Sequence, residues 1–119
     1  MLPFHHTYLE CLARNTEQAV MALRPVRLGS DVKPPTKVRH VAPYYPESER
    51  QAQREGVVVI ESTISPNGCV ISAVVTRSAS TKLDISAMRA VTGWVFSPTL
   101  FGGRRVPVLL TVNVRFSLR

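Results

Sequence analysis

Long apolar segments are missing from this sequence of 119 residues. No stretch approaches the ~18–20 consecutive apolar residues of a helix that spans a bilayer. Residues 1–25 also lack the basic segment followed by an apolar segment that marks a secretory signal peptide. The sequence therefore predicts no membrane span and no leader within this chain.

Cysteine and histidine are scarce, with two of the first and three of the second. Cys11 and Cys69 form no Cys-x-x-Cys motif, and His5, His6 and His40 are too scattered to complete a metal site with them. We therefore expect no metal and no cofactor. Cys69 lies beside a predicted turn and Cys11 in another region, so we expect both thiols to be unpaired, although a disulfide in an oxidising compartment stays open.

Clusters of charge are also absent, although 15 Lys and Arg stand against 8 Asp and Glu and give a net charge of +7. No three basic residues are consecutive, and no basic stretch alternates with aromatic residues as on a surface that binds single-stranded nucleic acid. We expect no nucleic-acid partner. With 19% charged and 45% hydrophobic residues, the composition is that of a folded domain with a small core.

A catalytic constellation is not apparent. Ser78 and Ser80 have no strained nucleophile turn, and no local acid orients His40. The carboxylates fall on a predicted exposed helix, a strand face and a helix start, where nothing pairs them for acid–base work: Glu47, Glu49, Glu55, Glu61 and Asp84. We therefore predict that the chain is not an enzyme.

Three regions differ in pattern along the chain. Residues 1–28 are expected to be an N-terminal segment with one weak amphipathic helix, which Pro25 ends. Residues 29–43 are rich in Pro and are expected to be a linker. Residues 44–119 have the clearest periodicity, so we expect one folded domain there.

The first half of that domain predicts a helix and a hairpin. Pro46 suits the first position of a helix over residues 46–55, and Gly56 suits its C-terminal stop. Val58, Ile60 and Ile64 share one face of a strand at period two. Asn67-Gly68 is a strong hairpin signal, because both residues accept positive φ, and the returning strand is expected from Val70 to Arg77.

The second half predicts a helix and a long strand. Leu83, Ala87, Val91 and Trp94 recur at helical spacing, so we expect Trp94 on the helix face that packs on the sheet. Residues 106–118 alternate apolar and other residues throughout, which predicts one long strand with one buried face.

The order of these elements predicts an α+β fold with a three-stranded sheet and two helices on one face. The helix after the second strand makes a crossover, so the last strand runs parallel to the second strand. The simplest sheet has the order 2-1-3, with the first strand central and one side of the last strand unpaired. On the residues alone, this free edge is equally consistent with a cover, formed by the N-terminal segment or a second copy, and with a site for β-strand addition.

Several motifs in this order resemble the TonB C-terminal domain family. They are Tyr45-Pro46 before a helix, Gly56 at a strand start, Ser65-Pro66-Asn67-Gly68, Leu83-Asp84 at a helix start, Trp94-Val95-Phe96-Ser97-Pro98 and the alternating terminal strand. The resemblance covers residues 29–118 and rests on order and spacing rather than on any single motif. The sequence departs from the family in two respects. Ala42 stands where well-known members have a Gln, and the N-terminal membrane helix and long spacer that are usual in the family are not found in this sequence.

The resemblance implies a periplasmic module that transmits energy from an inner-membrane proton-motive-force motor to outer-membrane transporters, for uptake of siderophores or other nutrients. Such modules bind the TonB box, a short peptide of the transporter, as an extra strand beside the terminal strand. The implied contact residues are Ala42, Pro43, Tyr44, Val108, Leu109, Leu110, Thr111, Val112, Asn113 and Val114. The alternative is a structural or sensor-associated domain whose terminal strand pairs with its own copy as a homodimer.

Proline substitution within the terminal strand is expected to distinguish donors that face the peptide from donors that face the first strand. We expect the N–H groups of Thr111 and Asn113 to differ in this respect. Tyr44 is expected to be exposed, Tyr45 to anchor the first helix on the core, and Arg104 and Arg105 to be solvated.

Overall fold

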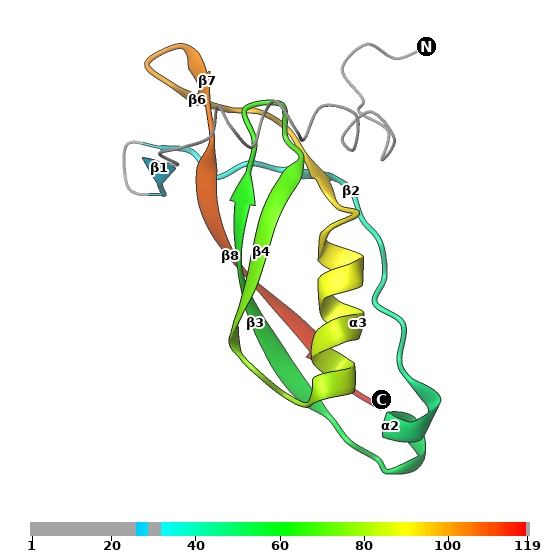
Figure 1. Cartoon of the computed structure of the whole chain (residues 1–119). Coiled ribbons are helices and arrows are strands. Elements are labelled where there is room, and N and C mark those ends of the chain that lie inside the picture. The colour runs from blue at the N-terminus through cyan, green and yellow to red at the C-terminus, as the bar shows by residue number, and fades with distance from the viewer. Residues whose placement is uncertain (1–25, 29–31, 119) are drawn as a thin grey trace.

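The structure is a computed structural model that describes residues 26–28 and 32–118. A four-stranded sheet in the order β1-β8-β3-β4 forms its centre (Figure 1). The strands are β1 (Val26–Arg27), β3 (Gly56–Ile64), β4 (Val70–Arg77) and β8 (Val108–Phe116). β3 pairs antiparallel with both β4 and β8, and β1 pairs parallel with β8.

The predicted α+β class is confirmed. β3 lies between β4 and β8, which is the arrangement that the crossover predicted. β1 is a fourth strand that the three-stranded prediction lacked, and it pairs with the edge of β8 that was expected to be free. The helix predicted within residues 1–24 lies outside the described residues.

The first helix is shorter than predicted. α2 spans Glu47–Gln51, and the chain leaves it through Gln53, whose φ of 53° is left-handed, so Gly56 is not the stop. Gly56 instead opens β3 where a Cβ would lie 2.9 Å from Ala79 Cβ. Glu49 was expected to be exposed, but it is buried, and its carboxylate accepts a hydrogen bond from Ser80 Oγ at 2.6 Å and pairs with Arg54 Nε at 3.2 Å.

The second helix also ends early. α3 spans Thr81–Val91, and the side chain of Ser80 caps it by accepting a hydrogen bond from the N–H of Leu83. The chain then turns at Gly93, so Trp94 lies beyond the helix rather than on its face. The predicted burial of Trp94 is nevertheless confirmed, with 6% of the residue exposed.

Residues 32–46 are here called the arm, and the part of the arm after residue 39 runs beside α3 to α2 (Figure 1). β2 (Lys37–Arg39) in the arm pairs with β5 (Val95–Phe96), and Val32 is buried in the core. Trp94 Nε1 donates a hydrogen bond of 2.8 Å to the carbonyl of Val41. The domain boundary at residue 44 stays a prediction.

Pro107 divides the predicted long strand into two pieces. β7 (Arg104–Val106) folds back on β6 (Thr99–Phe101) through Gly102-Gly103, and β8 starts after Pro107. Pro107 thus stands where the pairing partner changes from β6 to β3. Arg104 and Arg105 are exposed, as expected.

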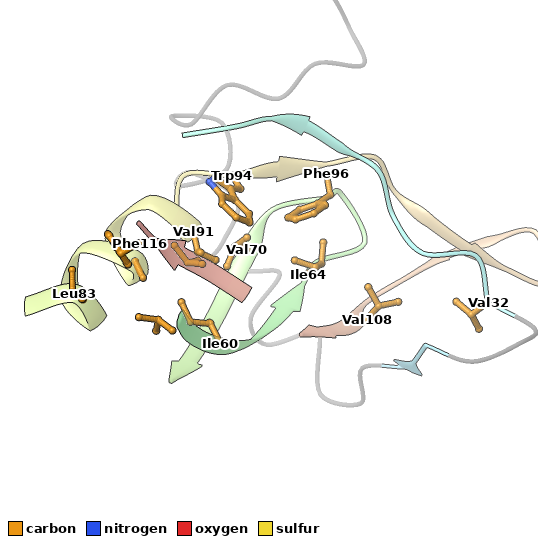
Figure 2. Packing of buried hydrophobic residues seen from close by; sticks show 13 residues of the cluster. Val32, Ile60, Ile64, Val70, Leu83, Val91, Trp94, Phe96, Val108 and Phe116 are labelled. Atoms are coloured by element: carbon orange, nitrogen blue, oxygen red, sulfur yellow. The ribbon is translucent and has the colours of Figure 1, made fainter. Parts of the chain in front are cut away.

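The core lies between the sheet and α3 (Figure 2). The predicted inward faces of both long strands are confirmed, because Val58, Ile60 and Ile64 of β3 meet Val108 and Phe116 of β8 in one cluster. From the other side the cluster is completed by Leu83, Ala87, Val91, Trp94 and Phe96.

The hairpin between β3 and β4 depends on Gly68. Its φ is 94°, and a Cβ there would lie 1.8 Å from the carbonyl oxygen of Phe96. The neighbouring Cys69 is disulfide-bonded, so the expectation that it is unpaired is wrong. Cys11 lies outside the described residues.

Candidate partner-binding edge

The direction of the backbone groups of β8 follows from one hydrogen bond. The N–H of Val26 donates to the carbonyl of Pro107 at 2.8 Å, so this carbonyl points toward β1 and away from β3. In a strand the N–H and C=O of one residue point to the same side, and successive residues alternate. The register between β3 and β8 has no irregularity, so the alternation holds along the whole strand.

The backbone of Leu109, Thr111, Asn113 and Arg115 therefore points away from β3. The even-numbered residues form the ladder with β3, where Val112 lies opposite Ile60. Thr111 and Asn113 are two residues apart and face the same side. The expectation that their N–H groups differ is wrong, and Val112 is the residue whose N–H faces β3.

β1 covers the start of this edge. It pairs Val26 with Val108 and Arg27 with Leu109. Among the described residues, no strand pairs with Leu110–Phe116 on the side away from β3. The predicted contact set Val108–Val114 is thus divided into a part beside β1 and a part that is open in the described structure.

A hollow lies where β1 ends. It has a volume of 350 Å³ and is lined by Arg27, Leu28, Glu61 and residues 109–111. Arg27 Nη1 lies 3.7 Å from Glu61 Oε2, and the two side chains are 77% and 39% exposed. A solvent-accessible pair of this kind contributes little to stability, so displacing it would cost little free energy.

Ala42, Pro43 and Tyr44, the other predicted contact residues, belong to the arm. Ala42 and Tyr44 line a groove of 410 Å³ against Ile85 and Arg89 of α3. Tyr44 is 71% exposed, as expected, and its carbonyl accepts a hydrogen bond from Ser86 Oγ. Most of the residues that line the groove are apolar, Lys82 and Arg89 are its basic residues, and it lies between the arm and α3.

Tyr45 links the arm to β8. Its ring meets that of Phe116 edge-on at 5.5 Å between centroids, which fits the predicted anchoring role. Partial burial, then the carboxylate of Glu55, raise the pKa of Tyr45. Farther along the arm, the Lys37 ammonium lies 3.5 Å from the centre of the Trp94 ring, and burial there lowers the pKa of Lys37.

Other chemistry is not concentrated in the described part of the chain. No three side chains that ligate metals gather there. Ser80 is engaged in capping α3, and Ser78 Oγ donates to the carboxylate of Asp84. None of the helices that the structure describes is long and apolar enough to cross a membrane.

Hydrogen exchange of the β8 amides should show the alternation directly. We expect the amides of Val112 and Val114, which face β3, to be protected, and those of Thr111 and Asn113 to exchange rapidly. The amide of Leu109 should be protected although it points to the same side of β8 as the amides of Thr111 and Asn113, because it faces β1. Amide exchange followed by NMR measures all five rates, and equal protection of Thr111 and Val112 would contradict the assigned direction.

Comparison with known proteins identifies the family to which this fold belongs. A family model described as the C-terminal part of the TonB protein of Gram-negative bacteria matches residues 41–118. The chain belongs to the TonB C-terminal domain family. Its terminal strand β8 is therefore the strand from which the family resemblance led us to expect partner binding.

Two TonB proteins are similar to the chain. Protein TonB of Vibrio cholerae serotype O1 is 33% identical over 87 residues, which is 72% of this chain and 36% of that protein. The chain thus corresponds to about a third of this curated relative. The solution NMR structure of the Pseudomonas aeruginosa TonB C-terminal domain superposes with a TM-score of 0.61 at 27% identity, covering 78% of this chain and 93% of that one.

Proposed function

We propose that this TonB C-terminal domain is a non-enzymatic periplasmic coupling module that binds the TonB box of an outer-membrane transporter by β-strand addition. In this role it transmits inner-membrane proton-motive energy for uptake of siderophores or other nutrients. The observation that supports the proposal best is the row of backbone groups of Thr111, Asn113 and Arg115, which point away from β3.

The open part of the edge suits an extended peptide. A partner strand beside Leu110–Phe116 would satisfy the outward N–H and C=O groups at every second residue. The open part has one charged residue, Arg115, near its end, so little electrostatic repulsion opposes a neutral strand. Each backbone bond contributes a net ~0.5–1.5 kcal/mol, which must offset the ordering of the peptide, so the affinity is modest.

The arm supplies a second contact in this proposal. Ala42, Pro43 and the exposed ring of Tyr44 offer apolar surface to transporter residues that flank the TonB box. Because Ala42 has no polar side chain, its contribution comes from the backbone and from apolar contact. The inner-membrane motor proteins known for full-length members of the family are the second partner in this proposal.

Titration with a TonB-box peptide tests the proposal. We expect saturable shifts of the Thr111, Asn113 and Arg115 amides in NMR spectra, and a molecular mass in sedimentation that corresponds to one domain and one peptide. A peptide of the same composition in scrambled order is the control. A concentration-dependent dimer that uses these amides, with no response to the peptide, would instead favour the structural alternative.

A further inference from the structure

We infer that β1 is a register stop, which confines a partner strand to Leu110–Phe116 and excludes it from the start of β8. The inference rests on the proposed function, because it concerns the same edge. It adds a limit on where the added strand can begin and on how long the paired part can be. β1 lies outside residues 41–118, the range that the family model matches.

The outward groups at the start of β8 already have partners. Val26 N–H donates to the carbonyl of Pro107 at 2.8 Å, and the register pairs Arg27 with Leu109. A partner strand that continued past Leu110 would have to remove β1 and replace its backbone bonds with equivalent ones. Such an exchange gains no hydrogen bonds, so the longer pairing has no energetic advantage from the backbone.

Side-chain packing favours β1 over a replacement. Val26 and Leu28 are half-buried and pack against the core cluster. Removing β1 would expose this apolar surface to water, which is unfavourable. Pro107 adds to the effect. It has no N–H group, so it cannot donate a backbone hydrogen bond to a partner strand that extends that far.

The hollow at the end of β1 lies where the added strand would end. Leu28, Leu109 and Leu110 supply its apolar surface, and Arg27 and Glu61 form its polar rim. A partner residue opposite Thr111 would point to the same face of the sheet as Arg27, Glu61 and Leu109, so its side chain would lie over the hollow. The structure therefore favours a partner with one apolar residue at this position.

Peptides of different extent test the inference. The first is a TonB-box peptide that pairs with Leu110–Phe116, and two longer versions extend it with alternating Thr and Val residues at one end or the other. One extension must lie over β1 whichever way the peptide runs. In the unaltered chain we expect that extension to change Kd by less than about twofold, because it replaces bonds that β1 already makes.

The variant Val26→Pro removes the N–H donor to Pro107. In this variant we expect the same extension to lower Kd by about threefold or more, because the added residues then find unpaired backbone groups. Val26→Ala is the matched control, since it shortens the side chain but keeps the donor, and it should behave like the unaltered chain. Thermal unfolding of both variants verifies that the sheet is intact.

Two results would overturn the register stop. One is an extension that tightens binding equally in the unaltered chain and in Val26→Pro. The other is a shift of the Val26 and Arg27 amides to unpaired values when the short peptide binds. In both cases the short peptide still binds, so the proposed function stands; a short peptide that does not bind removes both proposals.

Discussion

Trp94→Ala is expected to lower the free energy of unfolding by about 3–5 kcal/mol, the cost of truncating a large buried aromatic residue. Trp94 packs with Phe96 at 6.4 Å between ring centroids and belongs to the main core cluster. It also holds the arm, through its hydrogen bond to the carbonyl of Val41. Small domains have a total stability of only about 5–15 kcal/mol, so this variant should be close to unfolding at ordinary temperature.

Urea denaturation followed by circular dichroism measures this change. Tyr44→Ala is the matched control, because it also removes an aromatic ring from the arm region but at a position that is 71% exposed. We expect the control to change stability by less than about 0.5 kcal/mol, as is usual for surface positions. A cost below about 1 kcal/mol for Trp94→Ala would contradict its place in the core.

Proline at Asn113 is expected to weaken TonB-box binding by more than about tenfold while the domain stays folded, because only an outward N–H is lost. Proline at Val112 is expected to have the opposite consequence. Its N–H faces β3, opposite Ile60, so its loss interrupts the central ladder and should destabilise the fold severely.

Two further substitutions separate the backbone effect from the side-chain effect. Asn113→Thr keeps the donor and favours a strand, and Val112→Ala shortens the side chain but keeps its N–H. Peptide titration and denaturation of the four variants give binding and stability separately. Binding of unchanged affinity to a folded Asn113→Pro variant would show that the peptide does not use this edge.

The sequence predicted the parts of the fold that have a strong local pattern. The alternation along Val108–Phe116 indicated the strand and its buried face, and Asn67-Gly68 indicated the hairpin. The position of β3 between β4 and β8 followed from the connection order through the helix. These features depend on neighbours in sequence or on a general rule of chain topology.

The sequence could not predict features that depend on distant contacts. Val26–Arg27 is too short to show a strand pattern, and its pairing joins residues more than half the chain apart. Trp94 continues the helical spacing of Leu83, Ala87 and Val91 by coincidence, since the helix has already ended when the chain reaches it. The Pro-rich composition of the arm suggested a linker, although Val32 and Val41 pack onto the body.

The single Trp of the chain is also a built-in spectroscopic probe. Trp94 is buried where the arm meets the body. The centroid of the His40 ring lies 5.2 Å from that of Trp94, and the Lys37 ammonium lies over the Trp94 ring. Its emission should therefore be that of a shielded indole, and detachment of the arm should shift it to longer wavelength and increase quenching by added iodide. Because β8 carries no Trp, changes along the outer edge of β8 would leave this optical signal unaltered unless they also release the arm.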